Sequence, residues 1–388
     1  MLTREGCEAL DANDPLRSLR DHFELPSDVI YLDGNSLGPP PRIVRGRISE
    51  VMDGWATDLI SGWWSQDWIG LPARVGRRLE PLLGAEAGSV VCSDSTSVNL
   101  FKVVEAGCRL AEGDILTDSG NFPTDLYVLR SVAERHGRRL LVVDPERLSD
   151  GITESIGVMA ATHVDFRTGR RHDLAAITER AHKFGGLAIW DLSHSAGVME
   201  IGLAENRVDL AVGCGYKFLN GGPGAPAYLY VAPRLQAQLA NPITGWFGHA
   251  FPFEFSSDFV PAEGIGRMQV GTPAVLSMAA LEAALSVWEG VELGSVRAKS
   301  EALTSLFIGL IDQELGEEFE IATPRSAEHR GSQVSLRRMG AESLARDLAR
   351  IGVICDFRPP DLTRFGLAPL FIRFADVWDA VSRIKKAI

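Results

Sequence analysis

The 388-residue sequence has few cysteines, and they lie far apart. They are Cys7, Cys92, Cys108, Cys214 and Cys355. No two of them form a CxxC pair, which argues against a zinc site and against a disulfide framework. We therefore expect reduced thiols, no bound metal and a cytoplasmic protein.

Long apolar stretches and an excess of positive charge are also missing. No run approaches the roughly 18 apolar residues of a membrane span, and Arg4, Glu5 and Glu8 stand where a secretory signal needs an apolar core. The 39 Lys and Arg residues against 51 Asp and Glu give a formal charge of −12, which would repel the phosphates of nucleic acid. We expect neither a membrane nor a nucleic acid as a partner.

What is present is typical of a globular protein, with 45% hydrophobic and 23% charged residues. Short apolar runs recur at 89–94, 113–118, 139–144, 156–162, 186–191, 208–214 and 227–232. Between them lie two predicted helices. Pro123–Gly137 has a proline at the first turn and a glycine past the end, and Asp173–Phe184 has apolar residues at helical spacing. Apolar strands that alternate with helices predict an α/β fold, with a mostly parallel, doubly wound sheet.

The length predicts several domains, at about 150 residues each. We expect an N-terminal arm over 1–59 that crosses to a smaller domain, and a large α/β domain over 60–262. Residues 263–388 should form a helical connection and a small α+β domain. In this last part, Thr272-Pro273 should open a helix, and 333–336 and 353–357 should be strands.

Polar residues that end the apolar runs are the candidates for chemistry, since ligands of open α/β sheets bind beyond the carboxyl ends of the strands. Asp191 directly follows the 186–190 run, and His194 comes three residues later. A carboxylate there can hold a protonated ring nitrogen. The same residues also suit a helix cap, and taken alone the cap is the commoner explanation.

Lys217 lies in a glycine-rich stretch, 26 residues after Asp191 (217 − 191 = 26), which leaves room for one helix and one strand. Both side chains can therefore lie at one sheet edge. A lysine among small and aromatic groups can lose its proton and bond to an aldehyde. Alone, it is equally typical of a surface lysine before a Gly-Pro turn. No Gly-Lys-Ser/Thr follows, so the stretch is not a nucleotide P-loop.

A third candidate is Ser95-Thr96-Ser97-Val98-Asn99, between a predicted strand and a predicted helix. Hydroxyls and free N–H groups at a helix start can hold a phosphate, although plain capping is the commoner explanation. Phe122 offers a flat face for stacking. Together these parts match pyridoxal 5′-phosphate, whose pyridinium pairs with an aspartate and whose aldehyde bonds to a lysine.

With these residues in view, the sequence closely resembles the kynureninase family, within the aminotransferase-like (fold type I) superfamily of pyridoxal-phosphate enzymes. The similarity runs in order through 31–39 (YLDGNSLGP), 122–125 (FPTD), 191–194 (DLSH), 216–224 (YKFLNGGPG) and 364–370 (RFGLAPL). It covers nearly the whole chain. The 34–38 and 216–220 segments together are specific, whereas the Asp/Lys pair alone indicates only the superfamily.

The resemblance implies roles for single residues. Lys217 would bond to the cofactor and later move protons, Asp191 would pair with the ring nitrogen, and Tyr216 would assist proton transfer. Further cofactor contacts would be Thr96, Ser97, Phe122, Pro123, Thr124, Asp125, Thr162 and His194. Trp246 and Thr272 would reach the phosphate held by a neighbouring subunit, in a homodimer. Read alone, Trp246 suits a core and Thr272 a helix cap.

The implied substrate is L-kynurenine, hydrolysed to anthranilate and L-alanine in tryptophan catabolism, on the kynurenine pathway that also feeds NAD biosynthesis. Arg364 would grip its α-carboxylate bidentately, with Asn35 and Ser36 as further contacts. Alone, Arg364 is typical of a solvated surface charge. Trp64 would wall the aryl group, although the cluster of tryptophans at 55–68 is also typical of aromatic packing.

Trp64 and Thr272 together resemble the bacterial type, which implies unsubstituted kynurenine, with 3-hydroxykynurenine as a further substrate. A class V aminotransferase or a cysteine desulfurase shares the Asp/His/Lys framework, and Cys355 is the candidate nucleophile for the latter. A non-catalytic cofactor-binding regulatory protein is the remaining alternative. A missing lysine or arginine would favour it, but Lys217 and Arg364 are both present.

Overall fold

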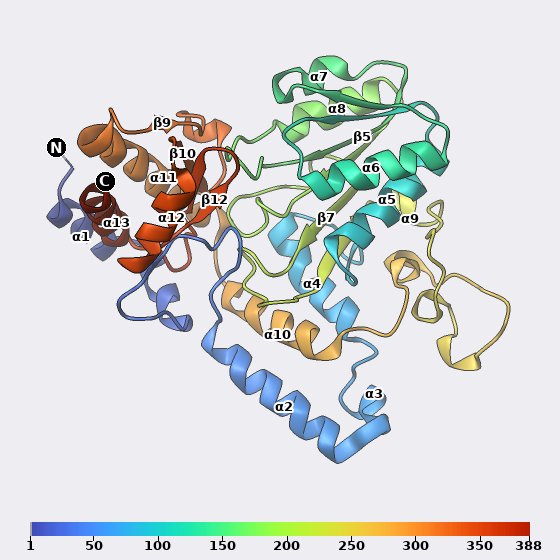
Figure 1. The fold of residues 1–388 in the computed structure, drawn as a ribbon. Helices are drawn as coiled ribbons and strands as arrows, with labels where there is room; N and C mark the ends of the chain where they lie inside the picture. The colour runs from blue at the N-terminus through green and yellow to red at the C-terminus, as the bar shows by residue number, and fades with distance from the viewer. Residues whose placement is uncertain (1) are drawn as a thin grey trace.

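The structure is a computed structural model that describes residues 2–388, and its centre is a seven-stranded sheet (Figure 1). In spatial order the strands are β2 (Val90–Cys92), β8 (Ala227–Val231), β7 (Leu210–Cys214), β6 (Leu187–Asp191), β5 (Ile156–Thr162), β3 (Asp114–Asp118) and β4 (Leu140–Val143). Neighbouring strands are parallel except where β8 pairs with β2 and β7. The predicted α/β fold with a mostly parallel sheet is confirmed.

Helices cover both faces of this sheet, because successive strand residues point to opposite sides. Ile189 of β6 packs in one core with α5 (Thr96–Leu110) and α6 (Pro123–Arg135). Ala188 and Trp190, on either side of it, pack in the other core. That core includes α4 (Leu71–Leu83), α7 (Leu148–Gly151), α8 (Leu174–Lys183) and α10 (Val275–Leu285). The strand ends are therefore where a ligand can reach the sheet.

A second, antiparallel sheet lies beside the large one (Figure 1). Its strands are β12 (Asp356–Arg358), β13 (Leu362–Gly366), β10 (Gln333–Arg337) and β9 (Glu320–Ile321), and its helices are α11 (Leu293–Leu315), α12 (Ala341–Arg350) and α13 (Phe374–Ala387). The N-terminus joins this part of the molecule. There, β1 (Ile30–Tyr31) pairs with β11 (Val353–Ile354), and α1 (Arg4–Ala12) packs on α13.

Two segments extend from this body. Helix α2 (Arg42–Asp58) packs along α10 and leads into α3 (Gly62–Ser65), and the chain after β8 forms α9 (Pro233–Gln236) before a long irregular stretch. The 3-10 helices are η1 (Arg17–His22), η2 (Leu59–Ser61), η3 (Pro145–Arg147), η4 (Trp246–Gly248), η5 (Pro252–Glu254), η6 (Gly264–Met268), η7 (Ser286–Trp288) and η8 (Ala327–His329). Within residues 2–388, every helix is too short or too polar to cross a bilayer.

Two local expectations are wrong. The helix expected to open at Thr272-Pro273 begins at Val275, and Ala274 precedes it, so Thr272 caps nothing. The single strand expected over 353–357 divides into β11 and β12, which pair with different strands because the chain turns between them. The domain boundaries after residues 59 and 262 stay a prediction.

The N-terminal arm touches the large sheet at Gly38. Its N–H donates to the Tyr216 carbonyl at 2.8 Å, and Asn220 Nδ2 donates to the Pro39 carbonyl at 3.2 Å. A Cβ at position 38 would lie 2.3 Å from both the Lys217 carbonyl and Asn220 Nδ2. Only glycine lets the arm lie this close to the loop that carries Lys217.

We predict that Gly38→Ala destabilises the protein by about 1–3 kcal/mol, because the added methyl overpacks a contact between two backbones. Gly46→Ala is the matched control, since Gly46 lies in α2 with open space around it. That change should stabilise by up to about 1 kcal/mol. Denaturant unfolding checks both, and equal stabilities of the two variants would contradict the close approach.

Candidate active site

Five loops at the carboxyl edge of the large sheet line one cavity of about 90 Å³. Asp191 and Thr162 end β6 and β5, and Lys217 follows β7. The lining consists of Thr96, Ser97, Phe122, Thr124, Asp125, Thr162, Phe166, Asp191, Ser193, His194, Tyr216 and Lys217. The structure thus brings together most of the residues expected to contact a cofactor. Pro123 does not line the cavity, but it opens α6 beside Phe122.

The cavity lining includes two buried carboxyl groups, Asp125 and Asp191. Asp191 Oδ1 accepts from the Ser193 N–H at 2.7 Å, whereas Asp125 Oδ2 has no hydrogen-bond partner among residues 2–388. Burial, and then the neighbouring Asp191 carboxylate, raise the pKa of Asp125 well above its ordinary value. Such a pair favours a cation between or beside the two groups.

Lys217 lies against an uncharged imidazole. Its Nζ is 2.9 Å from His194 Nε2. Burial, followed by the charges of Lys217 and Arg364, lowers the pKa of His194 well below its ordinary value, so Nε2 accepts the hydrogen bond from the lysine ammonium. His194 Nδ1 has no partner within residues 2–388. The histidine therefore fixes the lysine without adding a charge.

The N-terminus of α5 also lines the cavity. Ser95 is the N-cap and accepts from the Val98 N–H at 3.4 Å, and Thr96 and Ser97 follow in the first turn. Hydroxyls and free N–H groups at the start of a helix attract an anion. The segment can therefore serve both as a helix cap and as an anion site, because Ser95 caps α5 while Thr96 and Ser97 line the cavity.

Phe122 is partly exposed over the cavity, and Phe166 meets it edge to face, with 5.0 Å between ring centroids. Sequence reasoning missed Phe166. It lies in the loop just after β5, four residues past Thr162, and this position at a strand end is the signal that could have found it.

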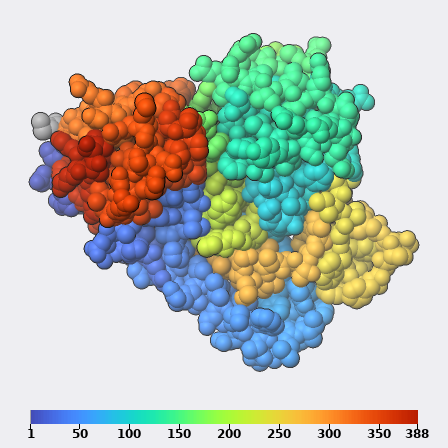
Figure 2. All heavy atoms as spheres, viewed as in Figure 1, coloured from blue at the N-terminus to red at the C-terminus, as the bar shows by residue number. Residues whose placement is uncertain are grey.

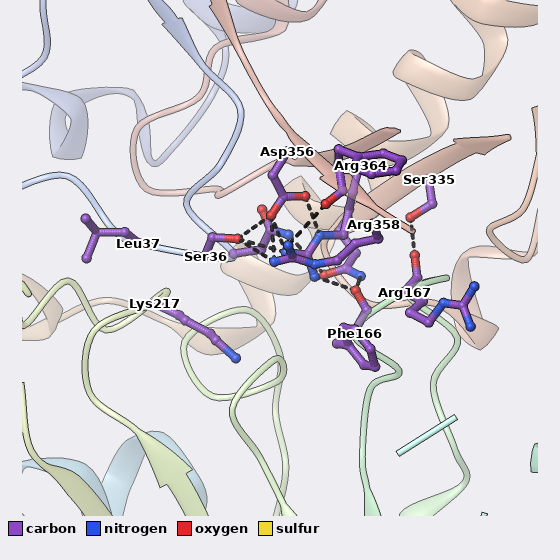
Figure 3. Close-up of polar contacts among 12 residues, drawn as sticks. Ser36, Leu37, Phe166, Arg167, Lys217, Ser335, Asp356, Arg358 and Arg364 are labelled. Atoms are coloured by element: carbon purple, nitrogen blue, oxygen red, sulfur yellow. Dashed lines mark hydrogen bonds and ion pairs between the residues drawn. The ribbon is translucent and has the colours of Figure 1, made fainter. Parts of the chain in front are cut away.

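Arg364 is buried rather than solvated, with 1% of its side chain exposed, so the surface-charge interpretation is wrong. Figure 3 shows it in a network with Ser36, Asp356 and Arg358, and its Nη2 donates to Ser36 Oγ at 2.8 Å. Asn35 is fully buried beside Gly366, and its Nδ2 lies 3.4 Å from Gln333 Oε1. Sequence reasoning missed Asp356 and Arg358.

Trp246, Trp64 and Thr272 also lie outside this cavity. The ring of Trp246 packs on Phe247 at 4.6 Å between centroids, and that of Trp64, 60% exposed, packs on Phe253 at 5.3 Å. Thr272 lines a neighbouring cavity that also contacts Tyr216. Within one chain, none of the three lines the cavity around Lys217.

Comparison with known proteins identifies the family. A family model described as the kynureninase C-terminal domain matches residues 296–384. A kynureninase of Deinococcus radiodurans is 48% identical over 97% of this chain and 94% of its own length. A kynureninase of Pseudomonas fluorescens is 43% identical over 98% of this chain and 94% of its own.

The chain belongs to the kynureninase family. It is accordingly a hydrolase that acts on carbon–carbon bonds and depends on pyridoxal 5′-phosphate. Solved structures agree in fold. The apo cysteine desulfurase of Thermococcus onnurineus has a TM-score of 0.81 at 19% identity, over 95% of this chain and 97% of its own. A C-DES variant with glycine covalently linked to the PLP cofactor has a TM-score of 0.83 at 18% identity, over 94% and 98%.

This fold similarity does not make the chain a desulfurase. Burial, and then the nearby Asp33 and Asp356 carboxylates, raise the pKa of the Cys355 thiol far above its ordinary value. A thiol that stays protonated is a poor nucleophile. The aminotransferase and desulfurase alternatives are therefore not favoured for this kynureninase-family chain.

The donor set of the cavity fits pyridoxal 5′-phosphate. The unpartnered Asp125 oxygen, beside Asp191, suits a protonated ring nitrogen, and the α5 N-terminus suits a phosphate. Lys217 lies in the same lining, and Phe122 offers a ring face. The cavity therefore offers carboxyl groups for the protonated ring nitrogen, a helix N-terminus for the phosphate and an amine that can bond to the aldehyde.

We predict that Asp125→Asn stabilises the cofactor-free protein and weakens cofactor binding. The folded-state pKa of Asp125 is raised, so the wild-type group contributes stability at low pH and loses it as the pH rises above about 4. The gain from the variant should therefore grow with pH, by at most about 1.4 kcal/mol per unit.

Urea unfolding of the cofactor-free protein between pH 5 and pH 8 measures this gain, with Asp53→Asn on the exposed side of α2 as control. A gain that shrinks as the pH rises would contradict the buried carboxylate pair. Titration with cofactor should separately show weaker binding by the variant.

Proposed function

We propose that the chain hydrolyses L-kynurenine to anthranilate and L-alanine, and that the residues of the cavity around Lys217 carry out the reaction. Water is consumed, the Cβ–Cγ bond of the substrate breaks, the carbonyl carbon becomes the carboxylate of anthranilate, and Cβ becomes the methyl group of alanine. The observation that carries the proposal is the pairing of Lys217 with a neutral His194 in a cavity that is also lined by a carboxyl pair and a helix N-terminus.

When bound, the cofactor supplies an electron sink that stabilises negative charge at the substrate Cα. Asp191 and Asp125 hold its ring nitrogen protonated, and Thr96 and Ser97 bind its phosphate. Lys217 Nζ takes the α-proton and returns a proton to the product, and His194 orients Nζ for this. Tyr216, which lies in the same lining, assists proton transfer.

Arg364 binds the α-carboxylate, with Ser36 and Asn35 beside it. The support is that two guanidinium groups, Arg364 and Arg358, share the single Asp356 carboxylate, which leaves positive charge for a further anion. Both lie within range of His194, since after burial and Lys217 their charges also lower its pKa. Fixing the carboxylate on one side orients the Cα–H bond toward Lys217.

We also propose a homodimer in which Trp246 and Thr272 complete the site of the partner subunit. The support is a set of exposed apolar side chains on two protruding segments, visible in Figure 2 as light blue (residues 42–65) and yellow (residues 240–260). Trp55, Ile60 and Trp64 are 51–74% exposed, and Phe255 is 80% exposed. Exposed apolar patches of this kind are typical of subunit interfaces.

The same surface bears on the substrate. The rings of Trp63 and Trp68 meet edge to face at 5.8 Å between centroids, which is aromatic packing. The side chain of Trp64 is mostly exposed, and we propose that it contacts the aryl group of a substrate held by the partner subunit. The enzyme would act on kynurenine formed during tryptophan breakdown in the cytoplasm.

We predict that the purified protein with added cofactor releases fluorescent anthranilate from L-kynurenine, and turns over 3-hydroxykynurenine less well. Lys217→Ala should remove both the turnover and the visible absorption band of the bound cofactor, because no other amine of the lining replaces Nζ. Lys183→Ala, at the end of α8, serves as the control. A band that survives in Lys217→Ala would remove this lysine from its role.

We predict that Lys217→Ala and Trp246→Ala, each inactive alone, recover activity when the two proteins are unfolded, mixed and refolded together. A mixed dimer has one site with an intact lysine and an intact partner tryptophan. Anthranilate production measures the recovery. No recovery, in mixtures shown by tagged subunits to contain mixed dimers, would contradict a shared site.

A further inference from the structure

Arg364 is held by more partners than a free substrate-binding arginine needs. Its Nε donates to Asp356 Oδ1 at 2.9 Å and its Nη2 to Asp356 Oδ2 at 2.5 Å, while Nη1 donates to the Phe166 carbonyl (Figure 3). Nη2 also donates to Ser36 Oγ. Four of the five N–H groups of the guanidinium are thus engaged within the described chain, and the fifth is on Nη1.

The register of the small sheet brings this about. Asp356 of β12 lies directly opposite Arg364 of β13, so the two side chains share one face of the sheet. The hydroxyl of Ser36, from the N-terminal arm, donates to Asp356 Oδ2 at 2.6 Å. Two separate segments, β12 and the N-terminal arm, therefore converge on one edge of the Arg364 guanidinium, the edge formed by Nε and Nη2.

The charges of the network leave room for one more anion. Arg358 donates to Asp356 Oδ2 at 2.8 Å, so one carboxylate lies between two guanidinium groups. Burial opposes ionisation of Asp356, but the hydrogen bonds and charge of Arg364 prevail and lower its pKa. Asp33 lies beside them, and burial together with the Asp356 charge raises its pKa to about 7. While Asp33 is protonated, the two arginines and the one ionised carboxylate, that of Asp356, carry a net charge of +1.

We propose that Asp356 is a positioning residue for substrate binding: it fixes the Nε/Nη2 edge of Arg364, so that the Nη1 side faces the α-carboxylate. This rests on the proposed function, in which Arg364 binds that carboxylate. Substrate then binds to Nη1 and competes with Ser36 Oγ for Nη2, while Asp356 stays in place. The Phe166 carbonyl on Nη1 joins this anchor to the ring that packs on Phe122.

The opposite role would be that of an internal competitor, in which the Asp356 carboxylate occupies the arginine until substrate displaces it. The two roles differ in sign. Loss of a positioning carboxylate weakens substrate binding, whereas loss of a competitor strengthens it. The register favours positioning, because the cross-strand pair holds Asp356 beside Arg364 whether or not substrate is bound.

The test is Asp356→Asn in the holoenzyme. We expect KM for L-kynurenine to rise about 10- to 100-fold, as for a lost hydrogen bond between charged groups, with a much smaller change in kcat. The visible band of the bound cofactor should not change. Binding of kynuramine, the analogue that lacks the α-carboxylate, should equal that of the wild type.

Asp361→Asn is the matched control, because Asp361 lies between the same two strands and pairs with Arg337 at 3.2 Å, away from Arg364. An unchanged or lower KM in Asp356→Asn, or an equal loss of kynuramine binding, would overturn the proposal. If that variant does not fold, Asp356→Ser decides by the same criteria, since it also removes the carboxylate that holds the Nε/Nη2 edge of Arg364. Failure of the wild type to release anthranilate would instead overturn the proposed function.

Discussion

The paired carboxyl groups of Asp125 and Asp191 are the constraint on which the rest of the site depends. Two buried carboxylates cannot both stay ionised unless a cation lies close by. Asp191 is the last residue of β6, and Asp125 lies in the first turn of α6, so the sheet and a helix hold the pair without a flexible loop. In the proposed function, the unpartnered Asp125 oxygen accordingly helps to stabilise a positively charged ring nitrogen.

The proposed function also requires a protein of formal charge −12 to bind two anions, the cofactor phosphate and the substrate carboxylate. The helix N-terminus at Thr96 attracts a phosphate through backbone dipoles, and it needs no side-chain charge. In the proposed function, the substrate carboxylate binds instead beside two arginines around one aspartate, which leave one positive charge while Asp33 is protonated. The acidity of the chain therefore belongs to its surface, while each anion meets local positive potential.

The sequence alone was enough to predict the large sheet, Lys217, Asp191 and the start of α5, because fully apolar strands are easily recognised and ligands bind at their carboxyl ends. Asp356 could not be predicted, since its place beside Arg364 depends on the register between two short strands of the small sheet. The helix start near Thr272 was misplaced because a Thr-Pro pair resembles a cap, whereas the following residues stay extended until Val275. Trp246 and Trp64 do not line the Lys217 cavity of their own chain, and their role at the site of a partner subunit stays a proposal.

The most direct test of the central claim is the ¹⁵N chemical shift of the ring nitrogen of isotopically labelled pyridoxal 5′-phosphate bound to the wild-type protein. The account predicts a protonated nitrogen at pH 8, because Asp191 and Asp125 stabilise the cation. In Asp191→Asn the shift should move to that of an unprotonated nitrogen. An unprotonated nitrogen in the wild type at neutral pH would contradict the account.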